Sequence, residues 1–274
     1  MLQENEFAAE LAVAVKACDL AQEVIRSYFL NSFEVEVKAD NSPVTIADIE
    51  SEQVIRETLL EAFPDYGFFG EETGQQAMHS PYRWLVDPID GTKSFVRGSP
   101  FFSTQIALQK DNRLVVGVSN APCYADSSGR ARQGEQLTAV AGQAPLLNGV
   151  EVKTSKVTRL QDAFLSSGNL KTMASDAGLW QRYGHIVSQA ARVRGYGDFF
   201  HYHQLASAQA DLVIESDVNI LDIAALSLAV TEAGGVFTDL HGQPVTLATT
   251  SVLAAATPEL HQQALSLLSK HLNA

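Results

Sequence analysis

The segment Trp84–Phe95, WLVDPIDGTKSF, places two acids and a glycine in a pattern around which the rest of the chain is organised. Its apolar start predicts a buried strand. We expect this strand to end at Asp87-Pro88, because proline has no N–H to donate and a fixed φ angle. Asp87 and Asp90 then lie across a turn, where two unpaired carboxylates repel each other unless a divalent cation neutralises them.

The two residues that follow these acids predict an anion site. Gly91 and Thr92 are small and stand at the predicted first turn of a helix, where free N–H groups and the helix dipole favour a phosphate. Metal-binding carboxylates followed directly by such a turn are what metal-assisted hydrolysis of a phosphoester needs. Alternatively, the segment is an ordinary strand, turn and helix with exposed acids.

Composition narrows the class of protein. The chain has 274 residues, enough for one large domain or two subdomains. A formal net charge of −13 argues against a nucleic-acid partner, which would need clustered basic residues. The longest apolar runs are too short to span a membrane, and the acidic N-terminus does not resemble a signal peptide. Cys18 and Cys123 are too few for a disulfide framework, so we expect a cytoplasmic protein in a reducing compartment.

The order of predicted elements changes near residue 145. Helices are predicted at 7–30 and 47–62, and strands at 33–38, 66–70, 101–109, 114–121 and 136–141. The later strands indicate an antiparallel sheet. From residue 158 onward, predicted strands and helices alternate. The expected fold is therefore a layered α+β and α/β sandwich, with one subdomain at 1–145 and a second at 146–274.

Further acids stand at the ends of predicted elements. Glu71 follows the strand at 66–70, and Asp222 begins a helix at 221–233. Oxygen ligands without a nearby histidine or cysteine select hard cations, so we expect Mg²⁺, with Mn²⁺ as a possible substitute. Alternatively, Asp222 is a helix N-cap. His201 and His203 face different directions on a predicted helix and cannot bind one ion together, so they are interpreted as ordinary helix histidines.

Four motifs together resemble the inositol monophosphatase superfamily. They occur in the order Val44–Asp48 (VTIAD), Gly70–Glu72 (GEE), Trp84–Thr92 (WLVDPIDGT) and Leu221–Gly235. The resemblance covers essentially the whole chain. It implies a layered fold of two subdomains, usually a homodimer, that hydrolyses a small phosphorylated metabolite by in-line attack of metal-activated water.

The resemblance also implies a role for each matching residue. The magnesium ligands would be the side chains of Glu71, Asp87, Asp90 and Asp222, with the carbonyl of Ile89. Glu71 would also act in catalysis, beside Asp48 and Thr92, which would hold the attacking water. The backbone amides of Gly91 and Thr92 would bind the phosphate.

Two features are similar to the histidinol-phosphatase branch of the superfamily. These are Lys93-Ser94-Phe95 after the DGT motif and the segment Gly195–Asp198. Glu215, seven residues before Asp222, matches the substrate-facing Glu of the family as a whole. Asp198 and Glu215 would suit a cationic leaving group, and histidinol carries an amine and an imidazole. Alternatively, Asp198 is the N-cap of the helix predicted at 199–208.

Other functions on this fold stay open. One is an inositol-1-phosphate phosphatase. Another is a 3′-phosphoadenosine 5′-phosphate phosphatase, whose anionic nucleotide would be repelled by Asp198 and Glu215. The segment 216–220 departs from the loop that is usual in histidinol phosphatases. A non-catalytic regulator is also conceivable, but it would not need the intact set of metal acids together with Asp48 and Thr92.

Overall fold

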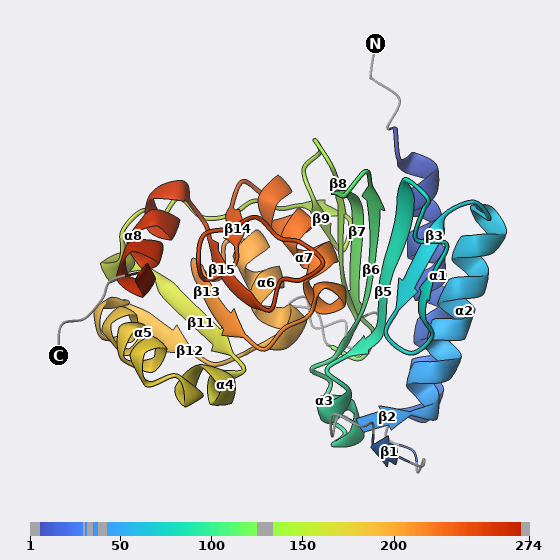
Figure 1. Cartoon of the computed structure of the whole chain (residues 1–274), viewed down its shortest axis with the longest axis horizontal. Helices are drawn as coiled ribbons and strands as arrows, with labels where there is room; N and C mark the ends of the chain where they lie inside the picture. The colour runs from blue at the N-terminus through green and yellow to red at the C-terminus, as the bar shows by residue number, and fades with distance from the viewer. Residues whose placement is uncertain (1–5, 30, 32–34, 38–42, 125–133, 270–274) are drawn as a thin grey trace.

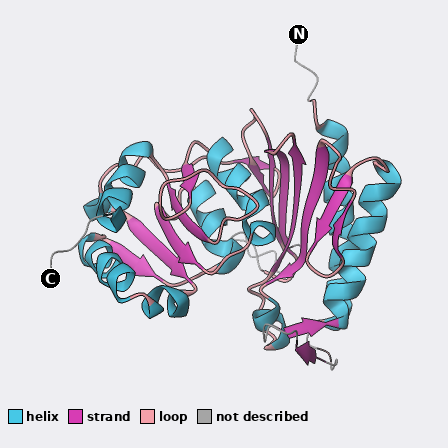
Figure 2. Ribbon diagram, viewed as in Figure 1, coloured by secondary structure: helices cyan, strands magenta, loops and turns pink. Residues whose placement is uncertain are grey.

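Helices and sheets alternate in layers through the molecule (Figure 1). The computed structural model describes residues 6–29, 31, 35–37, 43–124 and 134–269. From one side to the other, the layers are a helix pair, a large sheet, a second helix pair, a smaller sheet and an outer group of helices (Figure 2). This arrangement confirms the predicted layered sandwich.

The larger sheet has eight strands in the order β10-β9-β8-β7-β6-β5-β3-β4. Its strands are β3 (Gly67–Gly70), β4 (Gly74–Gln76), β5 (Tyr82–Asp90), β6 (Ser103–Lys110), β7 (Arg113–Ala121), β8 (Glu135–Val140), β9 (Leu146–Leu147) and β10 (Val150–Glu151). Neighbouring strands are antiparallel except β3 and β5, which run parallel. The antiparallel sheet predicted from the strands at 101–109, 114–121 and 136–141 is thus confirmed.

Helices α1 (Ala8–Tyr28) and α2 (Ile46–Ala62) cover the outer face of this sheet. Small side chains on α1, among them Ala14, Ala17 and Ala21, pack with large residues such as Trp84 in one buried cluster. Beside α2, the short strands β1 (Val35–Val37) and β2 (Pro43–Thr45) form a separate antiparallel pair. The predicted strand at 33–38 lies partly outside the described residues.

The smaller sheet has five strands in the order β12-β11-β13-β15-β14. They are β11 (Phe164–Gly168), β12 (Arg192–Arg194), β13 (Leu212–Ser216), β14 (Val236–Thr238) and β15 (Ser251–Ala255). Strands β12, β11 and β13 run parallel to one another, whereas β15 is antiparallel to both of its neighbours, β13 and β14. The outer face packs against helices α4 (Leu170–Ser175), α5 (Ala177–Gln189) and α8 (Pro258–Ser269), near the short 3₁₀ helix η1 (Leu160–Asp162).

Helices α6 (Asp198–Ala206) and α7 (Ile220–Glu232) lie between the two sheets. Helix α7 is buried around most of its circumference, as expected for a helix that is apolar on all sides. It approaches β7 closely, since a Cβ atom on Gly117 would lie 2.8 Å from the Ala225 carbonyl oxygen. Strands β9 and β10, beyond residue 145, belong to the larger sheet; the division into two subdomains stays a prediction.

The predicted end of the strand at Asp87-Pro88 is wrong. Strand β5 continues to Asp90, and its register with β6 shifts between Asp87 and Asp90. The irregularity accommodates Pro88, which cannot donate to the ladder. The N–H of Ile89 donates instead to Asp87 Oδ1 over 2.9 Å. The two acids are therefore presented by an irregular strand end rather than by a turn.

Asp176 separates α4 from α5, and its carboxylate accepts a hydrogen bond from Leu179 N and so caps α5. Among the described residues, no helix has both the length and the apolar character needed to cross a bilayer.

Candidate active site

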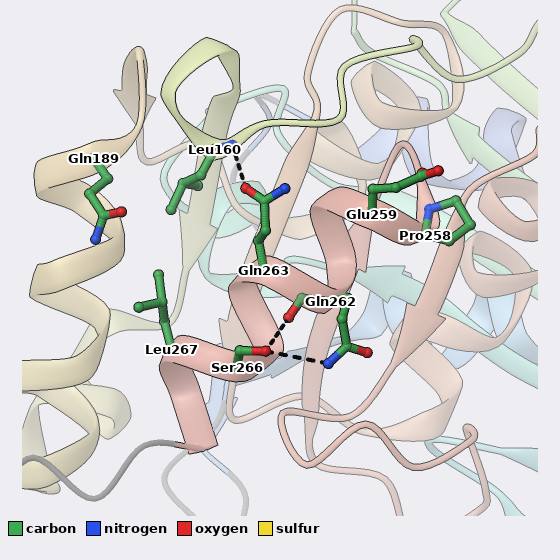
Figure 3. Close-up of a pocket in the computed structure, with 8 residues that line it drawn as sticks. All are labelled: Leu160, Gln189, Pro258, Glu259, Gln262, Gln263, Ser266 and Leu267. Atoms are coloured by element: carbon green, nitrogen blue, oxygen red, sulfur yellow. Dashed lines mark hydrogen bonds between the residues drawn. The ribbon is translucent and has the colours of Figure 1, made fainter.

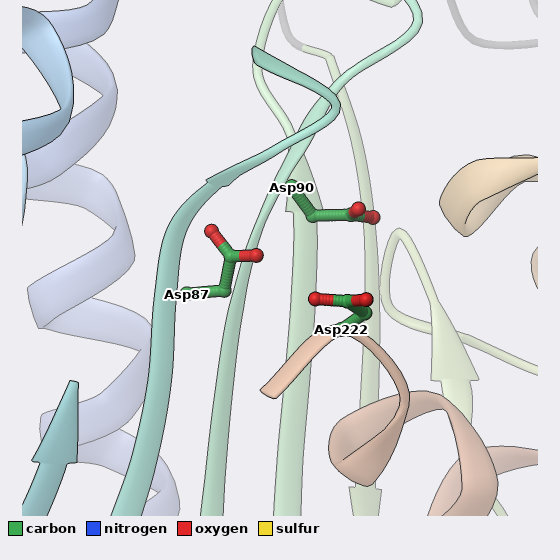
Figure 4. A group of neighbouring side chains, drawn as sticks. All are labelled: Asp87, Asp90 and Asp222. Carbon is green, nitrogen blue, oxygen red and sulfur yellow. The ribbon is translucent and has the colours of Figure 1, made fainter. Parts of the chain in front are cut away.

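Three aspartates meet between the two sheets. Asp87 and Asp90 come from the end of β5, and Asp222 comes from the first turn of α7 (Figure 4). A carboxylate oxygen from each lies within 4.8 Å of the others. Such a group of hard oxygen donors fits a divalent cation. Without a cation, the negative charge of each carboxylate disfavours ionisation of its neighbours.

The electrostatics of these acids agree with that fit. Burial, followed by the charge of Glu71 and then of Asp90, raises the pKa of Asp87. Burial and the charge of Asp222 raise the pKa of Asp90. Burial is also the main cause that raises the pKa of Asp222 to about 7, with a contribution from Glu71. Glu71, at the end of β3, thus lies within electrostatic range of all three aspartates.

The local structure of α7 explains how Asp222 is held. Asn219 is the N-cap, and its side chain accepts a hydrogen bond from Leu221 N over 2.7 Å. Asp222 stands three residues later, and its Oδ2 accepts the Asn219 N–H over 2.9 Å. This is a capping box. The alternative, in which Asp222 is the N-cap, is therefore wrong. The carboxylate that the capping box holds lies beside those of Asp87 and Asp90.

Asp48, which is buried, and Thr92, which is half-buried, form a hydrogen-bonded pair. The Thr92 hydroxyl lies 3.1 Å from Asp48 Oδ1 and 3.0 Å from the Ile89 carbonyl oxygen, with both groups placed to accept. The other oxygen of Asp48 accepts the Thr45 N–H over 2.7 Å and the Thr45 hydroxyl over 2.6 Å. Burial raises the pKa of Asp48, and these donors partly offset that rise. Asp48 therefore holds Thr92 in one place.

Gly91 connects the acids to a short helix, α3 (Thr92–Val96). Its φ of 91° lies in the left-handed region that favours glycine. A Cβ atom here would stand 2.9 Å from the Phe101 carbonyl oxygen, which belongs to the backbone. Only glycine fits this corner. As at the start of any helix, the first N–H groups of α3 have no acceptor within the helix.

A small cavity joins the metal-type acids to the predicted substrate acids. Asp90, Asp222, Asp198 and Glu215 all line it, together with Asn169, Tyr202, Val218, Ile223 and Leu226. Burial, with the nearby charge of Glu215, raises the pKa of Asp198 to about 6, whereas His201 and Lys93 act to lower it. Four of the sequence-predicted site residues, from β5, α6, β13 and α7, thus line one cavity.

Glu215 is held by two partners on α6. Its Oε2 lies 3.0 Å from His201 Nε2 and accepts a 2.6 Å hydrogen bond from the Tyr202 hydroxyl. Its Oε1 packs on Gly168, where a Cβ atom would lie only 1.9 Å away. His203 faces elsewhere and contacts Glu135 and Ser119. As predicted, the two histidines do not face one site.

Asp198 is not a helix cap. Gly197 occupies the N-cap position of α6, and Asp198 is the first helical residue. Its φ of 49° is left-handed, which is uncommon for a residue with a side chain. The alternative interpretation of Asp198 as an N-cap is therefore wrong, and its carboxylate lies at the cavity instead.

Comparison with known proteins shows the family to which the chain belongs. Residues 8–273 match the inositol monophosphatase family. The chain belongs to this family. A histidinol-phosphatase from Mycobacterium tuberculosis is 37% identical over 234 residues, covering 85% of this chain and 88% of that protein. An inositol-1-monophosphatase from Rhizobium meliloti is 30% identical over 216 residues, covering 78% of each.

The fold agrees with this assignment. The solved structure of an inositol monophosphatase from Zymomonas mobilis is 29% identical and superposes with a TM-score of 0.83, covering 97% of this chain and 100% of that one. The family and these relatives are phosphatases, so the chain is a phosphoric monoester hydrolase with an acidic group that fits a metal ion.

Three further residues at this inositol monophosphatase-type site were not predicted from the sequence. Tyr202 and Asn169 line the cavity, and His201 supports Glu215. Asn169 follows β11 directly, and in the sheet Gly168 pairs with Glu215 of the parallel strand β13. The carboxyl ends of parallel strands share one edge, so the Gly168-Asn169 sequence after a predicted strand was a usable signal. Tyr202 and His201 carry no such signal.

A larger hollow elsewhere on the enzyme has different chemistry. It lies between α5 and α8 and is lined by Leu160, Gln189, Pro258, Glu259, Gln262, Gln263, Ser266 and Leu267 (Figure 3). Several of its polar groups are already paired, such as Gln263 with Leu160 N and Ser266 with the Gln262 carbonyl. With one carboxylate among mostly amide and apolar side chains, it does not resemble a phosphatase site.

Proposed function

We propose that this phosphatase is a Mg²⁺-dependent enzyme that hydrolyses histidinol phosphate to histidinol and phosphate. The observation that carries the proposal is the single cavity lined by two metal-type acids and two further acids, Asp198 and Glu215. The first pair suits a cation that binds phosphate, and the second suits a cationic leaving group. The proposal is tested by ranking kcat/KM for histidinol phosphate, inositol 1-phosphate and 3′-phosphoadenosine 5′-phosphate.

The residues proposed to hold the cation are Glu71, Asp87, Asp90 and Asp222, with the carbonyl of Ile89. Their donor set favours Mg²⁺, with Mn²⁺ as a substitute. When bound, such a cation neutralises charge on the phosphate and acidifies a coordinated water. The capping box of α7 holds Asp222, and the irregular end of β5 holds Asp87, before any substrate arrives.

Asp48 and Thr92 are proposed to orient the attacking water. Because the Thr92 hydroxyl donates toward Asp48 and the Ile89 carbonyl, its lone pairs remain to accept a hydrogen bond from water. Asp48 is positioned to take up a proton at Oδ1, since Oδ2 is occupied by two donors from Thr45. The Gly91 and Thr92 amides, at the start of α3, are proposed to bind the phosphate.

Thr92→Ala should lower kcat by about 10- to 100-fold, because a water molecule that is no longer held in the attacking position reacts more slowly. Magnesium affinity, measured by calorimetry without substrate, should stay close to wild type, since Thr92 supplies no ligand atom. Thr92→Ser keeps the hydroxyl and should recover most of the rate. Parallel losses of magnesium binding and kcat in Thr92→Ala would assign Thr92 a structural role instead.

Substrate preference is proposed to depend mainly on Asp198. Glu215 is buried and already engaged by His201 and Tyr202, so it acts chiefly as a fixed negative charge behind the cavity. Asp198 is only half-buried and is open to a direct contact. The relative from Mycobacterium tuberculosis, named a histidinol-phosphatase, supports this choice.

Asp198→Asn should reduce kcat/KM for histidinol phosphate by about 10- to 100-fold, the value of one charge-assisted hydrogen bond. A phosphomonoester with a neutral leaving group, such as phenyl phosphate, should be affected much less, because the groups around phosphorus are unchanged. The matched control is Asp111→Asn, which alters an exposed aspartate with a similar φ of 48°. Equal loss on both substrates would show that Asp198 supports the fold or the metal acids, not the leaving group.

An inositol phosphate is the second candidate substrate. The relative from Rhizobium meliloti, named an inositol-1-monophosphatase, favours it. The acids of the cavity could also bind hydroxyl groups, although with less selectivity. A wild-type preference for inositol 1-phosphate would overturn the histidinol assignment and leave the metal chemistry intact. A cytoplasmic location and a homodimeric state complete the proposal.

A further inference from the structure

One fully buried acid has no part in the chemistry proposed above. Glu52 lies on α2, four residues after Asp48, and both side chains are 0% exposed. Residues four apart share one face of a helix. A buried carboxylate is costly unless it is well paired, so its partners identify what it does.

Glu52 binds the backbone of the turn that follows Glu71. Its Oε2 accepts the N–H of Glu72 over 2.8 Å, and its Oε1 accepts the N–H of Thr73 over 2.7 Å. Hydrogen bonds from N–H groups to an ionised carboxylate are about twice as strong as neutral ones. The preceding side of the turn is held as well, because Glu71 N donates to the Val86 carbonyl of β5 over 3.2 Å. The backbone that carries Glu71 is therefore fixed on both sides.

Gly70 leaves the space that this contact needs. A Cβ atom at Gly70 would lie 2.5 Å from Glu52 Oε1 and 2.6 Å from Phe68 Cε1. Any larger residue would press directly on the carboxylate. The glycine that precedes Glu71 thus has a packing reason that involves Glu52, although its backbone needs no left-handed conformation.

We propose that Glu52 is a positioning residue that sets Glu71 for cation binding. This inference rests on the proposed role of Glu71 as a metal ligand. Helix α2 then serves the site twice from one face: Asp48 holds Thr92, and Glu52 holds the Glu71 turn. Groups outside the coordination sphere that orient a metal ligand typically contribute about 10- to 100-fold to metal affinity, and Glu52 would do so through the backbone of Glu72 and Thr73.

The test is Glu52→Gln, with Mg²⁺ binding measured by calorimetry in the absence of substrate. The amide keeps the shape but turns an NH₂ group toward one backbone N–H. Mg²⁺ should bind about 10- to 100-fold more weakly, and kcat should recover largely at saturating Mg²⁺. Hydrogen exchange in the turn at residues 71–73 should become faster. Glu57→Gln removes the same charge from an exposed position on α2 and should change none of these.

Combining Glu52→Gln with Glu71→Gln distinguishes the positioning role of Glu52 from the proposed ligand role of Glu71. If Glu52 acts through Glu71, the affinity loss of Glu52→Gln should largely disappear in the Glu71→Gln background. Additive losses, or wild-type affinity in Glu52→Gln alone, would overturn the inference and leave the metal site standing. Wild-type affinity in Glu71→Gln alone would overturn the proposed ligand role itself. If Glu52→Gln does not fold, Gly70→Ala tests the same contact by displacing the carboxylate.

Discussion

Asp90→Asn should lower kcat by about 100-fold or more, because it removes a charge at the reacting centre without changing the shape of the side chain. A carboxylate oxygen of Asp90 lies within 4.8 Å of Asp222, and Asp90 lines the same cavity as Asp198 and Glu215. Its loss should therefore affect both the bound cation and the surroundings of the leaving group. The rate would be measured with histidinol phosphate over a full magnesium titration.

The same change should not unfold the protein. Burial and the charge of Asp222 raise the pKa of Asp90, so an amide at this position relieves repulsion in the metal-free protein. The melting temperature without Mg²⁺ should be equal to or above that of wild type. Asp65→Asn, at an exposed aspartate, provides the control for loss of one charge. Phosphatase activity that persists in Asp90→Asn, or in wild type treated with EDTA, would refute the metal mechanism.

Gly91→Ala should damage both stability and catalysis. A left-handed alanine costs about 1–2 kcal/mol, and forcing a methyl group into packed atoms costs about 1–3 kcal/mol more. The clash is with the Phe101 carbonyl oxygen, 2.9 Å from the new Cβ, which cannot rotate away. The free energy of unfolding, measured with urea, should fall by about 2–5 kcal/mol. Displacement of the Thr92 amide should lower kcat by about 100-fold.

Gly74→Ala provides a matched comparison for this prediction. Gly74 has a φ of 71°, also left-handed, but a Cβ atom there would meet no atom within 4 Å. It should lose only the conformational part, about 1–2 kcal/mol, and keep its activity. Equal effects of the two substitutions would mean that the close approach of Phe101 is unimportant.

The sequence was sufficient to predict the acids because their chemistry depends on local spacing. Asp87, Asp90, Gly91 and Thr92 follow one another around the end of a single strand. The predicted strand end was nevertheless wrong, because Pro88 was treated as a terminator and the register shift that accommodates it depends on the neighbouring strand β6. A rule about one residue could not include that neighbour.

Residues whose roles depend on partners distant in the sequence could not be predicted from the sequence. The contact between Glu52 and the turn after Glu71 spans about 20 residues of sequence, and Tyr202 meets Glu215 across an interface between a helix and a strand. The alternative in which Asp198 or Asp222 is a helix N-cap could not be excluded from the sequence for a related reason. Composition alone marks both as good N-caps, whereas the backbone angles at Gly197 and Asn219 decide which residue takes that position.

Helix α7 has a consequence for how the enzyme would work. It is buried against the larger sheet on one side and belongs to the same apolar cluster as residues of the smaller sheet, such as Val213 and Val252. Separating the sheets would expose this helix to water, at a cost of roughly 25 cal/mol for each Å² of apolar surface. Opening and closing of the halves as hinged bodies is therefore disfavoured. The cavity acids, which come from β5, α6, β13 and α7, are preorganised, and little binding energy has to be spent on assembling them around each substrate.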